Sequence, residues 1–125
     1  MVIEESAIDE IFSKCDENNQ CVVVVRAHGV TKQVYEKLEK YSQINPNFKT
    51  LDCACPYVKK IHKIVIDNAK EDTLLLVYGD KNHPEVKGIV SFAMGDVMVF
   101  SSTDELEGYL EICQSLLIRL RLLLV

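Results

Sequence analysis

The sequence predicts an α/β fold: a three-layer α/β/α lobe with a four-stranded, mostly parallel sheet. The main observation is that apolar periodicity alternates along the chain between the values typical of helices and of strands. Strands that alternate with helices at this spacing form βαβ units. The second observation is size, because 125 residues with 48% hydrophobic content fit one domain with a buried core. We therefore expect a single domain over residues 1–112 and an apolar tail over 113–125.

Each expected element has a local reason. The run over 21–25 is continuous and β-branched, which is typical of a strand buried on both faces. The helix over 31–41 has Thr31 as a candidate N-cap, and the helix over 56–70 begins at Pro56, which suits a first helical position. The other expected helices cover 6–14, 84–92 and 103–110, and the other strands cover 48–52, 73–78 and 97–100.

The tail is almost entirely Leu, Ile and Val around two arginines, with no turn residues before it. Three placements are open for it: an edge strand, a helix packed on the sheet, or an interface element. An exposed apolar end of this kind favours association between molecules, so self-association through the tail is one expectation.

Charge and cysteine content limit the classes of function. The chain has 14 Lys and Arg against 19 Asp and Glu, a formal net charge of −5, which argues against a nucleic-acid partner. The first residues do not resemble a secretory signal, and the longest apolar stretch is too short to span a bilayer, so we expect a cytoplasmic protein without a membrane partner. Its five cysteines are then expected to be reduced, as buried thiols or ligands. Three lysines are interpreted as a solvated helix face: Lys59, Lys60 and Lys63.

Three segments combine reactive side chains with a position between a strand and a helix. They cover residues 26–30, 52–56 and 79–85. Each follows the carboxyl end of an expected strand, which is the edge where open parallel α/β sheets bind ligands. We therefore expect these three loops to converge on one crevice.

Cys55 is the candidate thiolate, because it directly precedes the helix that begins at Pro56. The positive end of a helix dipole favours the thiolate that a nucleophile or a metal ligand needs. A small buried core thiol is the alternative, and position alone does not separate the two. Side chains of Cys53 and Cys55 would alternate between faces at a strand end, which argues against both binding one ion. The remaining cysteines are interpreted as packing residues: Cys15, Cys21 and Cys113.

His28, His83 and Glu85 are the candidates for an anion site. His83 precedes a proline, so it lies at an expected helix start with Glu85 in the first turn, and His28 precedes Gly29, where a ligand can approach the backbone. Taken singly, each histidine can be interpreted as an ordinary polar surface residue, and Glu85 as a residue that the helix dipole stabilises in the first turn. Together with helix N-termini at one edge they favour an anion, most naturally a phosphate, and a His/Glu pair that passes a proton. His62 flanks the apolar stripe of its helix and is interpreted as a core or boundary histidine.

The three loops carry motifs that resemble a known family. In chain order they read Arg-Ala-His-Gly-Val, Asp-x-x-Cys-Pro-x-Val-x-Lys-x-His and Gly-Asp-Lys-Asn-His-Pro-Glu-Val-x-Gly. This order and spacing resemble the 4-hydroxy-3-methylbut-2-enyl diphosphate reductase (LytB/IspH) family over residues 3–110, most strongly over 22–88. The resemblance implies an iron–sulfur oxidoreductase of the non-mevalonate isoprenoid pathway. Such an enzyme removes the C4 hydroxyl of (E)-4-hydroxy-3-methylbut-2-enyl diphosphate and yields isopentenyl and dimethylallyl diphosphate.

The resemblance also implies roles for single residues. Cys55 would be one of the three cysteines that hold a [4Fe–4S] cluster, His28 and His83 would bind the diphosphate, and Glu85 would donate a proton. The implied partners are the small diphosphate substrate and an electron donor such as ferredoxin or flavodoxin.

Departures from the family pattern imply a partial enzyme. The sequence resembles the middle one of three similar lobes, lacks the segments with the other two cluster cysteines, and departs from the pattern over 113–125. A [4Fe–4S] cluster needs three or four thiolates, so we expect a truncated chain that alone holds no stable cluster and is inactive. The alternatives are a stand-alone diphosphate-binding or assembly module and a vestigial domain without activity.

Overall fold

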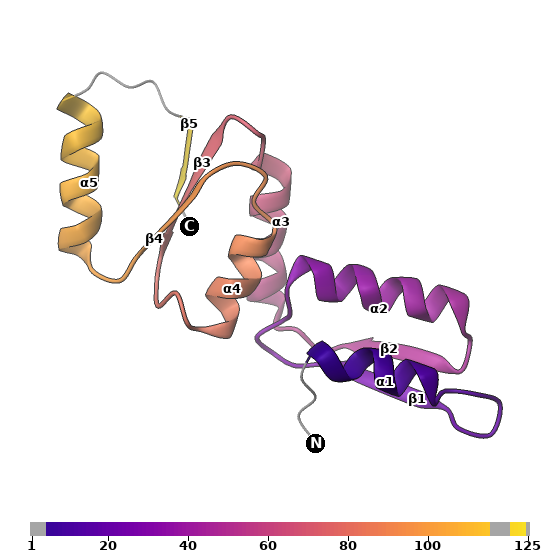
Figure 1. Ribbon diagram of the computed structural model, residues 1–125. Helices are drawn as coiled ribbons and strands as arrows, with labels where there is room; N and C mark the ends of the chain where they lie inside the picture. Colours follow the sequence, from indigo (N-terminus) through magenta and orange to yellow (C-terminus); the bar gives the residue numbers. More distant parts are fainter. Residues whose placement is uncertain (1–4, 116–120, 125) are drawn as a thin grey trace.

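The computed structural model describes residues 5–115 and 121–124, in which helices and strands alternate along the chain (Figure 1). Within these residues, no helix has both the length and the apolar character needed to cross a membrane. The elements follow in the order η1 (Glu5–Ala7), α1 (Ile8–Ser13), β1 (Cys21–Val25), α2 (Lys32–Ile44), β2 (Phe48–Asp52), α3 (Pro56–Asn68), β3 (Thr73–Tyr78), α4 (Pro84–Ser91), β4 (Val97–Phe100), α5 (Thr103–Ser115) and β5 (Arg121–Leu124). All strand pairs are parallel, which confirms the predicted α/β class.

The strands lie in two sheets and not in the single four-stranded sheet that the sequence predicts. β1 pairs with β2, with Cys21 opposite Phe48 and Val25 opposite Asp52. The second sheet has the order β4-β3-β5. Periodicity identifies a strand from its own residues, but strand neighbours are set by contacts between distant segments, and this is why the sheet prediction was wrong.

The end of the predicted tail forms the fifth strand. Arg121–Leu124 pairs in parallel with β3, from Thr73 to Leu76, and lies at the edge of the second sheet. Of the three placements that the sequence leaves open for the tail, the structure shows an edge strand. Residues 116–120 and 125 of the tail lie outside the described residues, and the domain limits of 1–112 and 113–125 stay a prediction.

The second sheet has helices on both faces, which is the predicted three-layer arrangement. Leu75 and Val77 of β3 pack against side chains of α3 and α4. Leu74 and Leu76 point the other way and form a cluster with side chains of α5. Because β3 is buried on both faces and has a strand on each side, it is the central strand of this half of the molecule.

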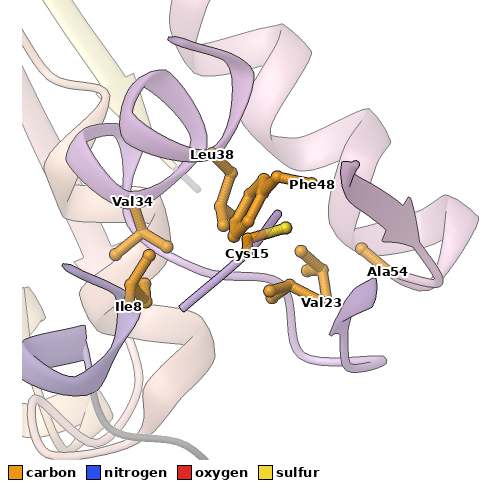
Figure 2. Packing of buried hydrophobic residues seen from close by; sticks show 8 residues of the cluster. Ile8, Cys15, Val23, Val34, Leu38, Phe48 and Ala54 are labelled. Atoms are coloured by element: carbon orange, nitrogen blue, oxygen red, sulfur yellow. The ribbon is translucent and has the colours of Figure 1, made fainter. Parts of the chain in front are cut away.

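The first sheet is covered by helices on one face only. Its inner face contributes to a core with α1 and α2, part of which Figure 2 shows: Ile8, Cys15, Val23, Val34, Leu38, Phe48 and Ala54. On the other face, Val22, Val24 and Leu51 are 59%, 52% and 54% exposed. The expectation that residues 21–25 are buried on both faces is therefore wrong, because a valine run marks a strand without showing which of its faces is covered.

Gly95 provides a test of this packing. It lies in the turn before β4, where an added β-carbon would be 2.3 Å from the carbonyl oxygen of Thr73. Because backbone must then shift, Gly95→Ala is expected to lower the free energy of unfolding by about 1–3 kcal/mol, measured by urea denaturation.

Gly108→Ala is the matched control, since Gly108 lies in α5, where an added β-carbon meets no side chain and no other segment within 4 Å among the described residues. The higher helix propensity of alanine should raise stability by up to about 1 kcal/mol. Equal effects of the two substitutions would contradict the packing described at the start of β3.

Candidate functional site

The three predicted loops meet, although their strands lie in two sheets. The backbone N–H of Cys55 donates to the carbonyl of Ala27 at 2.9 Å and joins the loop after β2 to the loop after β1. His28 Nδ1 lies 2.7 Å from Glu85 Oε1 and joins the loop after β1 to the start of α4. The loops therefore contact one another as predicted, with the first loop between the other two. They do not all line the cavity described below, to which only the third loop contributes.

His28, His83 and Glu85 form one cluster. His83 is the N-cap of α4, and its Nδ1 accepts a hydrogen bond of 3.3 Å from the backbone N–H of Glu85. The rings of His28 and His83 lie with their centroids 5.5 Å apart and their planes at 90°. Because Nδ1 of His83 is an acceptor, its neutral ring carries the proton on Nε2. The side chains of His28 and Glu85 are 43% and 39% exposed, so solutes can reach the pair.

A cavity of about 350 Å³ opens beside this cluster, at the carboxyl end of β3. Its wall combines a polar part from the loop after β3 with an apolar part from α3, β3 and α4. The lining residues are Ile61, Val77, Tyr78, Gly79, Asp80, His83, Glu85, Val86 and Ile89. Two of the three clustered side chains thus face a space large enough for a small ligand.

The loop that carries Cys55 is held by Asp52. Its Oδ1 accepts a hydrogen bond of 2.9 Å from the N–H of Ala54, and its Oδ2 lies 2.8 Å from Lys59 Nζ. Burial acts to raise the pKa of Asp52, but Lys59 and the Ala54 N–H outweigh it and hold this pKa below its usual range. Cys55 itself is half-buried at the N-cap of α3, ahead of Pro56.

The role of Asp52 was missed by sequence reasoning, which also placed Lys59 only on a solvated helix face. A signal was present, because an Asp whose side chain accepts from the N–H two residues later is a common turn motif. The pairing of Asp52 with Lys59 depends on the direction in which α3 leaves the loop, and the sequence pattern does not predict this direction.

His62 is a buried residue of α3, as the sequence predicts, with 5% of its surface exposed. Its ring lies 4.6 Å from that of Phe92, measured between centroids. Its Nε2 is buried and has no hydrogen-bond partner in the described part of the chain. Burial lowers the pKa of His62, against a smaller opposite effect of Asp52.

The cysteines do not gather around one point. All five are free; Cys15 is buried, as its interpretation as a packing residue requires, while Cys53 is exposed. Among residues 5–115 and 121–124, no group of three or more His, Cys, Asp or Glu side chains is placed to hold one metal ion. The described donors therefore do not fit a [4Fe–4S] cluster, which needs three or four thiolates.

Comparisons with known proteins agree with the loop motifs. A family model described as LytB protein matches residues 2–121 and so reaches into the predicted tail. A 4-hydroxy-3-methylbut-2-enyl diphosphate reductase of Helicobacter pylori strain Shi470 is 39% identical over 100 residues, which are 80% of this chain and 34% of that protein. A protein of the same name from Fusobacterium nucleatum is 40% identical over 98 residues, 78% of this chain and 11% of its own length. The chain thus spans about a third or less of these relatives.

A solved structure of (E)-4-hydroxy-3-methyl-but-2-enyl diphosphate reductase has a similar fold. The match has a TM-score of 0.58 at 19% sequence identity and covers 99% of this chain and 53% of that one.

The burial of His62 predicts a pH-dependent stability. The unfolded chain takes up the His62 proton near pH 6.5, and the folded chain does so only at lower pH. Between these values the unfolded state binds more protons, so stability is lost as the pH falls, by at most about 1.4 kcal/mol per pH unit. Urea denaturation between about pH 8 and pH 5 measures this slope. His62→Phe should reduce it, and a slope that the substitution leaves unchanged would rule out His62 as its source.

Proposed function

The chain belongs to the LytB protein family, and on this premise we propose that it is part of a cytoplasmic 4-hydroxy-3-methylbut-2-enyl diphosphate reductase of the non-mevalonate isoprenoid pathway. The contact that supports this proposal most is the one of 2.7 Å between His28 and Glu85. It joins the first and third motifs, which are separated by 57 positions in the sequence.

The proposed ligand of the cluster is the diphosphate of the substrate. His28 contacts Glu85 through Nδ1, which leaves its second ring nitrogen for a phosphate oxygen, to which it donates when it carries a hydrogen. His83, whose Nδ1 accepts from the backbone, donates through Nε2–H. The N-terminal end of α4, which begins at Pro84, adds the positive end of a helix dipole at the same place.

Glu85 is the proposed proton donor. Its carboxyl group lines the cavity and contacts His28. In the proposed reaction the C4–O bond breaks as the protonated carboxyl gives its proton to the departing hydroxyl, which leaves as water, and His28 returns a proton to the carboxylate through the same contact. The two electrons enter the remaining allyl group, and a second proton, taken from solvent, adds to one of its carbons to complete the isopentenyl or dimethylallyl product. The two electrons come from a donor such as ferredoxin or flavodoxin and not from these side chains.

Cys55 is proposed as one thiolate ligand of the family's [4Fe–4S] cluster. It lies at the N-cap of α3, directly ahead of Pro56. The other thiolates must come from outside the residues described, which is in keeping with a chain that spans about a third of its Helicobacter relative. The reductase activity is therefore proposed for a complete enzyme and not for this chain alone.

Binding of inorganic pyrophosphate, measured by isothermal titration calorimetry, tests the anion site. The chain should bind pyrophosphate, and His28→Ala and His83→Ala should each weaken binding by about 10- to 100-fold, because each removes a hydrogen bond to a charged group. Lys63→Ala is the control, since Lys63 is exposed and pairs with Asp67 on α3. No binding by the unaltered chain, or equal loss in the control, would refute the anion site.

Anaerobic reconstitution with iron and sulfide tests the assignment of Cys55. The chain alone should develop no stoichiometric visible absorbance from thiolate-bound clusters, because it lacks the other ligands. Mixed with the remaining segments of a family enzyme, it should contribute to a cluster that Cys55→Ser abolishes and Cys53→Ser retains. A stable cluster in the lone chain, or one that survives Cys55→Ser, would contradict the assignment.

A further inference from the structure

The proposed chemistry does not use His62, yet this residue has an unusual position. It is 95% buried on α3, and its Nε2 has no hydrogen-bond partner among the described residues. A buried polar atom without a partner costs stability, and an apolar side chain of similar size would avoid that cost. A hydrogen bond at Nε2 therefore does not explain why a ring occupies this position, and the explanation must lie in the space that the ring fills.

Two glycines lie directly against the ring. A β-carbon added at Gly29 would be 3.2 Å from His62 Cε1, and one added at Gly88 would be 3.2 Å from His62 Nε2. Both distances are shorter than ordinary van der Waals contact, so neither position has room for a side chain while the ring stays in place. Gly29 also has a φ of +70°, which glycine adopts without strain. One edge of the ring thus lies close to two stretches of backbone.

These two glycines belong to the segments that carry the proposed site. Gly29 directly follows His28 in the loop after β1. Gly88 lies three residues after Glu85, and residues at this spacing share one face of a helix, here α4. The Cε1–Nε2 edge of the imidazole ring therefore lies against both the backbone next to His28 and the helix that carries Glu85.

We propose that His62 is a positioning residue, whose ring acts as a spacer between Gly29 and Gly88 and so sets the contact between His28 and Glu85. The ring also lies near the aromatic rings of Phe92 and Tyr35, with centroids at 4.6 Å and 6.5 Å. The importance of the His28–Glu85 contact for catalysis rests on the proposed function, whereas its dependence on His62 does not.

A hydrogen bond away from the His62 ring also connects the segment after β1 to α4, and its removal serves as a comparison with removal of the ring. The backbone N–H of Lys32, at the start of α2, donates to Ser91 Oγ at 2.8 Å, at the end of α4. Ser91→Ala removes this bond and the bond of 2.6 Å that Ser91 Oγ donates to the Gly88 carbonyl, but it keeps the ring of His62. If the spacer sets the geometry, Ser91→Ala should disturb the cluster less than loss of the ring.

The experiment is nuclear magnetic resonance of the chain with labelled histidine, without any ligand. The chain has three histidines, so the ring signals are few and can be assigned from single substitutions. The readouts are the ring shifts of His28, the backbone amide shift of Glu85, and the Overhauser contact between the His28 and His83 rings. Circular dichroism confirms in each variant that the chain is folded.

His62→Ala should shift the His28 and Glu85 signals and abolish the Overhauser contact, whereas His62→Phe, which keeps a planar ring, should retain both. Gly88→Ala is the second route if His62→Ala does not fold, because it pushes against the ring from α4 and should shift the same signals. Lys63→Ala, on the exposed face of α3, should shift neither.

The proposal is wrong if His62→Phe disturbs the cluster as much as His62→Ala. It is also wrong if Gly88→Ala leaves the signals of His28 and Glu85 unchanged in a folded chain, or if Ser91→Ala alone reproduces the effect of His62→Ala. Pyrophosphate titration of the same samples separates the two proposals. A chain that shows these shifts but binds no pyrophosphate keeps His62 as a positioning residue and refutes the anion site.

Discussion

Helix α3 is the element on which the rest of the structure depends, because it packs against the second sheet, beside β3 in Figure 1, and also lies against the loop that follows β1. Its three buried residues, Val58, His62 and Val65, follow one another at helical spacing along one stripe. Val58 and His62 lie against Gly29 in the loop after β1. Val65, one turn further, packs into the core of the second sheet. Among the described residues, no strand of one sheet pairs with a strand of the other. The buried residues along one side of α3 therefore connect the two sheets.

The site depends on this relation, since no single sheet contains it. His28 follows a strand of the first sheet, while His83 and Glu85 lie at the start of a helix that covers the second. Asp52 links the two at a further point, because it ends β2 and its carboxylate binds Lys59 on α3. A substitution at the junction can therefore affect the anion site without touching it.

Local features of the fold were predictable from the sequence, and features set by distant contacts were not. The bounds of the first four strands are those predicted, because β-branched runs and turn residues next to them act over a few positions. Helix ends were less accurate: α2 continues to Ile44, up to the extended Asn45 that precedes a proline, and α3 ends at Asn68, because helix ends vary by one or two residues with local capping. Which strands pair is a non-local property, and so the two sheets and the place of β5 had to come from the structure. For the site, strand-end position was enough to select His28, His83 and Glu85, but not to find Asp52 or the contacts of His62.

The order of the second sheet affects how the chain is made. The central strand, β3, is synthesised before both of its neighbours, since β4 and β5 come later in the chain. Translation adds about 5–20 residues per second, so the backbone N–H and C=O groups of β3 have no strand to pair with for a period of seconds, until the next strand has left the ribosome. During this time the buried run from Leu74 to Val77 is an unpaired apolar strand, the kind of segment that other chains can capture. The order that gives the finished sheet a protected central strand thus leaves that strand without partners during synthesis.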